Sequence, residues 1–87
     1  MWSQFFRNWS GDIPRRGLIV TTLNEAIPFK GFMLSNDMLL LERTNPDPSG
    51  SRFIFLGFDS ISSVKLIDSL SESVFTQIGF AGQMSGR

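Results

Sequence analysis

The sequence predicts a mainly β fold, in which an N-terminal α-helix precedes a strongly bent, five-stranded antiparallel barrel and a short C-terminal helix follows it. Three observations predict this fold. Apolar residues first recur at helical spacing, in residues 2–9, and five short β-rich segments separated by turn formers then follow. The fourth segment is apolar on both faces, so each of its faces needs cover. A chain of 87 residues has room for one domain, predicted over 1–78, with a flexible tail over 79–87.

The N-terminal helix is predicted from a single apolar stripe. Trp2, Phe5, Phe6 and Trp9 follow the spacing i, i+3, i+4 and i+7, and a glycine at position 11 is a plausible end. The stripe has two interpretations: it packs across the open end of the barrel, or it lies in a membrane interface. Interfacial helices usually carry several basic residues, and this one carries a single arginine. Packing within the protein is therefore favoured, and no membrane partner is expected.

Five strands are predicted from runs of β-branched and aromatic residues. Polar or glycine- and proline-containing turns such as "NPDPSGS" separate them. A glycine within the second run, Gly31, marks a bend or bulge, because a glycine inside a strand weakens packing. The predicted strands cover residues 17–23, 26–35, 37–44, 52–58 and 62–68.

The C-terminal helix is predicted from a capping box. Ser69 and Glu72 have the S-x-x-E spacing, the apolar residues that follow lie roughly on one side of a helix, and Gly79 is a plausible stop. The run "SVFTQIGF" also alternates in polarity, so a strand is the alternative for this segment.

Composition argues against catalysis and points to an intracellular protein. The chain has no His, Cys or Tyr, which removes the usual nucleophiles and bases near neutral pH, and we expect no enzyme activity and no cofactor. Four acids, Asp37, Glu42, Asp59 and Asp68, show no metal-ligand spacing, so no metal is expected. Without cysteines, a signal peptide or a long apolar run, the predicted location is the cytoplasm.

The order of elements resembles that of the Sm-like (LSm) proteins, and among them the bacterial Sm-like RNA chaperones. "GLIVTTLNEAIPFKGFMLS" is similar to the first half of the Sm signature, with Gly31 at the position of its strand-bending glycine. "SRFIFLGFDSISSVKLID" is similar to the second half. A simple bulge in another small barrel is the alternative reading of Gly31. The resemblance covers roughly residues 3 to 68.

The resemblance implies a homo-oligomeric ring, with the fourth strand (52–58) of one subunit pairing with the fifth (62–68) of the next. It also implies binding of single-stranded RNA. Arg15 and Arg16 resemble a basic ring edge, although a solvated connector pair is the plainer interpretation. Asn36 and Asp37 match the loop between the second and third strands, and Phe58 is a candidate for base stacking.

The sequence departs from the family where RNA is bound. The loop between the second and third strands is cut to Ser35–Asp37, and an acid, Asp59, stands where a basic residue is usual. The eight basic residues are balanced by eight acidic ones, so bulk charge does not favour nucleic acid. An oligomeric scaffold or protein-interaction module that has lost the RNA pocket is therefore the alternative function.

Overall fold

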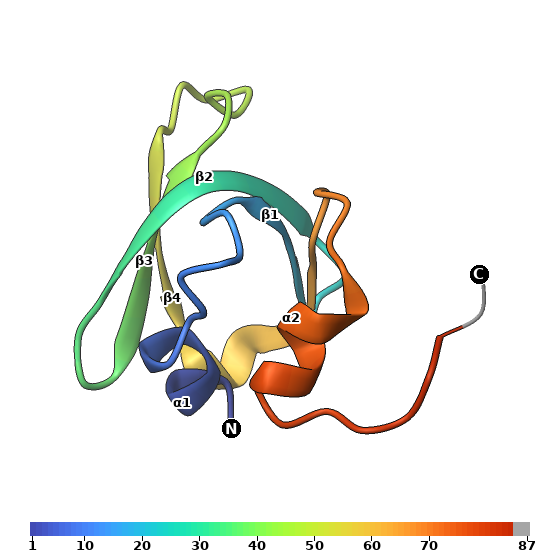
Figure 1. The fold of residues 1–87 in the computed structure, drawn as a ribbon. Coiled ribbons are helices and arrows are strands. Elements are labelled where there is room, and N and C mark those ends of the chain that lie inside the picture. The colour runs from blue at the N-terminus through green and yellow to red at the C-terminus, as the bar shows by residue number, and fades with distance from the viewer. Residues whose placement is uncertain (85–87) are drawn as a thin grey trace.

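A computed structural model describes residues 1–84 and shows a curled antiparallel sheet with two short helices beneath it (Figure 1). The predicted mainly β class, the five strands and both helices are confirmed. The elements are α1 (Trp2–Arg7), β1 (Gly17–Thr21), β2 (Ala26–Leu34), β3 (Met38–Arg43), β4 (Phe53–Gly57), the 3-10 helix η1 (Phe58–Ser60), β5 (Ile61–Lys65) and α2 (Glu72–Gln77).

The strands lie in the order β4-β3-β2-β1-β5, with every neighbouring pair antiparallel. β2 is the longest strand and arches over the interior, so that it pairs with β1 along its first half and with β3 along its second (Figure 1). Its register with β3 shifts between Phe29 and Gly31. Such irregularities let a strand bend.

β4 and β5 occupy the two ends of the sheet. They are consecutive in the chain and joined by η1, but within residues 1–84 no ladder pairs one with the other. The structure thus shows a curled five-stranded sheet, and each end strand keeps one edge without a ladder partner.

Several predicted boundaries are wrong: the first strand ends at Thr21 rather than at residue 23, and Phe58 lies in η1 rather than in the fourth strand, predicted over 52–58. α1 ends at Arg7, and Asn8 is its C-cap rather than a residue near Gly11. The fifth strand covers Ile61–Lys65 rather than 62–68. It begins early because pairing with β1 continues to Thr21, beyond which the Thr22 N–H donates to the Ser60 carbonyl.

The predicted capping box is also wrong. The N-cap of α2 is Ser71, not Ser69, and no side chain bonds to the free N–H groups there. The Glu72 carboxylate instead accepts a hydrogen bond from the Met84 N–H at 2.6 Å. Gly79 follows the helix at φ +107°, a conformation that favours glycine, so the predicted stop lies where the helix ends.

The core lies inside the curl of the sheet and under α1. Phe6, the one fully buried residue of α1, is 1% exposed and packs edge-on against Phe32 at 5.1 Å between ring centroids. Trp9 stacks on Phe6 and donates its Nε1–H to the Ile13 carbonyl. The aromatic stripe therefore packs across the end of the sheet. The buried core consists of Phe6, Ile19, Ile27, Phe29, Phe32, Leu39, Leu41 and Ile61.

The last described residues, Gly79 to Met84, form no helix or strand and extend away from the sheet (Figure 1). The rest of the predicted tail, residues 85–87, lies outside the described part of the chain. No helix in residues 1–84 is long and apolar enough to cross a membrane.

Candidate functional site

The most distinctive surface is the side of β2, β3 and β4 that faces away from the core, called the outer face below. In these strands alternate residues point inward, and the intervening ones point outward. On the outer face Met33 is 69% exposed, Phe53 58% and Phe55 67%. The outer face consists of Met33, Met38, Leu40, Phe53 and Phe55, with Lys30 and Glu42 at one end.

The strand register sets these side chains in rows across the sheet. Met33 pairs with Leu40, and Leu40 pairs with Phe55, which gives a row of three apolar side chains. Gly31, Glu42 and Phe53 form the next row in the same way. Neighbouring side chains in such rows are about 5 Å apart at Cβ, so the apolar atoms form one continuous surface.

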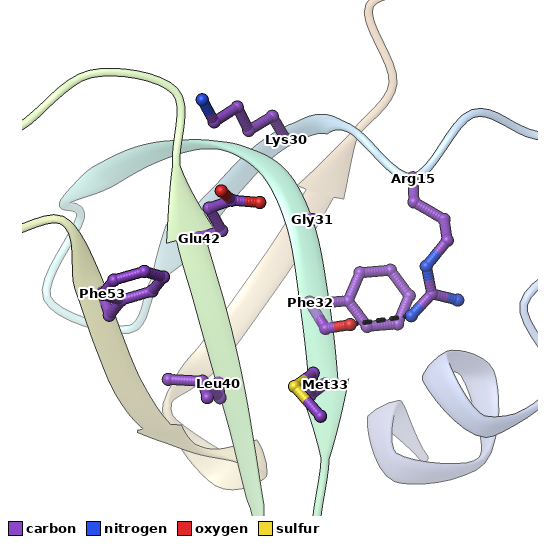
Figure 2. A pocket seen from close by; sticks show the side chains of 8 residues that line it. All are labelled: Arg15, Lys30, Gly31, Phe32, Met33, Leu40, Glu42 and Phe53. Atoms are coloured by element: carbon purple, nitrogen blue, oxygen red, sulfur yellow. Dashed lines mark hydrogen bonds between the residues drawn. The ribbon is translucent and has the colours of Figure 1, made fainter.

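A shallow groove of about 410 Å³ opens at the charged end of the outer face (Figure 2). Gly31 contributes no side chain, and the Glu42 carboxylate lies over it: a Cβ at position 31 would come 2.8 Å from Glu42 Oε1. Lys30 extends from the neighbouring position on β2, and Phe53 forms the opposite wall (Figure 2). With Arg15 also in its lining, the groove thus combines two cations, an anion and an exposed aromatic ring.

β4 also presents a free backbone edge. The Arg43 N–H donates to the Arg52 carbonyl, which identifies Arg52 as a residue whose backbone groups face β3. Along an antiparallel strand, the side on which the backbone N–H and C=O groups lie alternates from residue to residue, so the backbone groups of Phe53 and Phe55 and the N–H of Gly57 point away from β3. The Phe53 carbonyl accepts a hydrogen bond from the Ser51 hydroxyl at 3.2 Å, whereas no hydrogen bond from the N–H groups of Phe53, Phe55 and Gly57 on this side is seen within residues 1–84. These are the donors and acceptors that another strand would use.

The structure places Arg15 against β2. Its guanidinium carbon lies 3.6 Å from the centroid of the Phe32 ring, and Nη2 donates to the Phe32 carbonyl at 2.8 Å. Figure 2 shows this bond and the position of Arg15 at the side of the groove. The arginine predicted as a phosphate contact therefore already has an aromatic and a carbonyl partner within the chain.

Arg16 is paired as well. Its Nη2 lies 2.6 Å from Asp68 Oδ1 and its Nε 3.1 Å from Oδ2, a two-point contact that ties the start of β1 to the segment after β5. The hydrogen bond with the guanidinium lowers the pKa of Asp68, and the same contact raises the pKa of Arg16. This arginine, too, is engaged with a partner inside the chain.

The remaining predicted RNA contacts are not gathered with these arginines into one cavity. Asn36 and Asp37 form the exposed turn between β2 and β3, where Arg7 donates to the carbonyls of Ser35 and Asn36, each at 3.1 Å. Phe58 lies in η1 and packs against the core, with its ring centroid 6.5 Å from that of Phe6.

Sequence reasoning missed the outer face as a site. The signal was present in β4, where the prediction of two apolar faces is confirmed: Ile54, Leu56 and Phe58 pack on the core, and Phe53 and Phe55, on the other face, are exposed. The sequence does not show which face of β4 stays exposed, because that depends on where α1 packs. Arg7, which connects α1 to the β2–β3 turn, was also missed as a structural contact.

In residues 1–84 no three His, Cys, Asp or Glu side chains lie together in a way that could hold a metal ion. Comparison of the chain with family models, with curated proteins and with solved structures found no match.

Proposed function

We propose that this chain is the subunit of an Sm-like homo-oligomer that functions as a protein-assembly scaffold, with β4 of one copy pairing with β5 of the next. The observation that carries the proposal is the free edge of β4, the side of the strand that faces away from β3. The residues whose backbone groups point to this edge include Phe53 and Phe55, which are exposed. β5 supplies the complementary free edge at the other end of the sheet.

An exposed apolar edge strand is a hazard for a monomer, because it is a template for uncontrolled pairing. Monomers usually protect such an edge with charged residues, a proline or a bulge. β4 (FIFLG) contains no charged residue and no proline. Pairing between copies satisfies the backbone groups and protects the edge. In a closed ring, β4 of each subunit pairs with β5 of the next subunit, so no strand edge stays unpaired.

The test is the mass of the protein in solution, measured by light scattering on a sizing column. The proposal expects a mass of several subunits for the natural sequence. A suitable edge variant is Gly57→Pro, because Gly57 has φ −70° and ψ 146°, which proline adopts, and its N–H points away from β3. This variant removes an edge donor while keeping the ladder bonds to β3.

We expect Gly57→Pro to reduce the assembly to smaller species while its circular dichroism stays that of the natural chain. Gly11→Ala is the control, since a Cβ at Gly11 meets no atom within 4 Å and the residue lies far from the edge in sequence. A natural chain that elutes as a monomer would contradict the proposal.

Binding of single-stranded RNA is the second candidate. The groove on the outer face favours it, because the cation Lys30 and the exposed ring of Phe53 line the same groove, and basic groups together with aromatic rings are typical of sites for single strands. Glu42, in the same groove, opposes phosphate.

Titration of labelled U-rich and A-rich oligomers at two salt concentrations tests this candidate. Binding at the groove weakens with salt and is reduced by Lys30→Ala and by Phe53→Ala, whereas Lys65→Ala, on β5, leaves it unchanged. Absence of binding to both oligomers at low salt would rule out this function for the two sequences tested and leave the scaffold.

A further inference from the structure

We propose that the outer face binds the outer face of a second copy of this chain, in a two-fold, face-to-face contact that is separate from the pairing of strand edges. The axis lies parallel to the strands, between β2 and β3. Each Met33 then lies over Leu40 of the other copy, and each Lys30 faces Glu42 of the other copy. This contact does not require the edge pairing proposed above.

The area of the patch supports an interface. Its five large apolar side chains include two phenylalanines and a methionine that are more than half exposed, and together they present roughly 500 Å² of apolar surface. That falls within the range of about 300 to 600 Å² for the largest apolar patch on a typical monomer, where such patches often mark a binding surface.

The charges on the patch identify the occupant as a copy of the same chain. A two-fold contact brings a surface against itself, so a patch with charges of one sign repels its own copy. Here the rim has charges of both signs: the cations Lys30 and Arg15 and the anion Glu42. Arg15 is engaged with Phe32, whereas neither Lys30 nor Glu42 forms an ion pair with any side chain of residues 1–84. The zero net charge of the chain adds no long-range repulsion between copies.

The strand positions allow these two groups to meet. Glu42 pairs with Gly31, and Lys30 precedes Gly31 on β2, so the two side chains lie at nearly the same height along neighbouring strands. A two-fold axis parallel to the strands preserves that height and exchanges β2 with β3. Lys30 of each copy therefore comes opposite Glu42 of the other, twice per dimer.

The central experiment exchanges these charges and measures the mass in solution and the dissociation constant. Lys30→Glu places two acids opposite each other, Glu42→Lys places two bases there, and each variant alone should dissociate at least about tenfold more readily than the natural chain. An equal mixture of the two variants should associate again, because acids of one chain then face bases of the other.

Recovery of association in the mixture shows that the two charges act between chains and not within one chain. Each chain in the mixture still lacks its own combination of Lys30 and Glu42, so a structural role inside one chain would not be restored. A mixture that stays as dissociated as its components overturns the proposal. So does a mass that neither single variant changes.

A second variant tests the apolar part. Met33→Glu should halve the mass of the assembly, while Leu23→Glu, at an 89% exposed position in the turn before β2, should leave it unchanged. Both substitutions are at exposed sites, so neither removes a core contact.

The outcomes distinguish this contact from the edge pairing. A natural chain that is a dimer, and becomes a monomer with Met33→Glu, supports the face-to-face contact and contradicts the ring. A ring whose mass Met33→Glu leaves unchanged supports the edge pairing and overturns the inference drawn here. A ring mass that is halved supports both contacts, and a monomeric natural chain contradicts both.

Discussion

The guanidinium carbon of Arg15 lies over the ring of Phe32, 3.6 Å from its centroid, while Nη2 donates to the carbonyl of the same residue. Phe32 is buried, and on its inner side it packs against Phe6 and Trp9 of the N-terminal segment. The connector between α1 and β1 is therefore anchored to the second half of β2 by one side chain that makes two different contacts.

Replacing Arg15 should test this anchor. We expect Arg15→Ala to lower the free energy of unfolding by about 1 to 2 kcal/mol, because a cation–π contact and a charged hydrogen bond are both lost. Arg15→Lys should recover only part of the loss, since an ammonium group cannot lie flat over the ring while reaching the carbonyl. Urea denaturation measures both, with Arg52→Ala, at an exposed position before β4, as the control. Equal stability of the Ala and natural chains would show that the contact contributes nothing.

Phe6 should be the residue of α1 on which folding depends most. Phe6→Ala removes a ring that is 1% exposed and leaves a cavity between α1 and β2, so we expect a loss of about 3 to 5 kcal/mol. Phe53→Ala, at an exposed phenylalanine, should cost less than about 1 kcal/mol. Thermal denaturation of the two variants makes the comparison, and similar losses would mean that α1 does not cover the core in solution.

Two glycines in strands should respond differently to alanine. A Cβ at Gly17 would overlap the backbone carbonyl oxygen of Lys65, which cannot move without breaking the pairing of β1 with β5. A Cβ at Gly31 would meet only the end of the Glu42 side chain, which can turn away. We therefore expect Gly17→Ala to destabilise the fold by several kcal/mol and Gly31→Ala by about 1 kcal/mol or less.

Gly11→Ala is the control for the glycine pair, as no atom lies within 4 Å of the added methyl group. The denaturation midpoints of the three variants rank their losses of stability. A larger loss for Gly31→Ala than for Gly17→Ala would mean that the bend of β2 itself requires glycine.

The Arg16–Asp68 pair predicts a dependence of stability on pH. Because the pKa of Asp68 is lower in the folded chain than its ordinary value of 3.8, the pair stabilises the fold while the carboxylate is ionised. That contribution is complete above the ordinary pKa and is lost as the pH falls through the lowered value in the folded state. Asp68→Asn should remove this part of the acid sensitivity.

Unfolding in urea at pH 7 and near pH 2.5 measures the effect of Asp68→Asn. The difference between the two pH values should be smaller for the variant than for the natural chain, and Asp12→Asn, in the exposed connector, should leave the difference unchanged. The pair is exposed on the Arg16 side, so salt should weaken its contribution.

Much of the fold was predictable because local patterns decide it. The aromatic stripe of α1, the five β-rich runs and the turn between β3 and β4 all correspond to elements of the structure. The errors lie at boundaries, where one long-range contact outweighs a local signal. β5 ends at Lys65, and Asp68 beyond it is held by Arg16, 52 positions earlier in the sequence.

The candidate site was less predictable, because it depends on what the rest of the chain leaves uncovered. The alternation of β4 placed Phe53 and Phe55 on one face and Ile54, Leu56 and Phe58 on the other, and both faces are apolar, so the residue types did not show which of the two would stay exposed. Equally, nothing in the residue types showed that Arg15 would lie on Phe32 or that Arg16 would pair with Asp68.

By itself, the amino-acid sequence determined the secondary structure and which side of each strand is apolar, because strand and helix periods act over a few neighbouring residues. The tertiary structure alone decided which apolar side is buried and which arginine has a partner. Those outcomes follow from contacts between residues far apart in the chain, such as Phe6 with Phe32 and Arg16 with Asp68, and local periodicity does not record them.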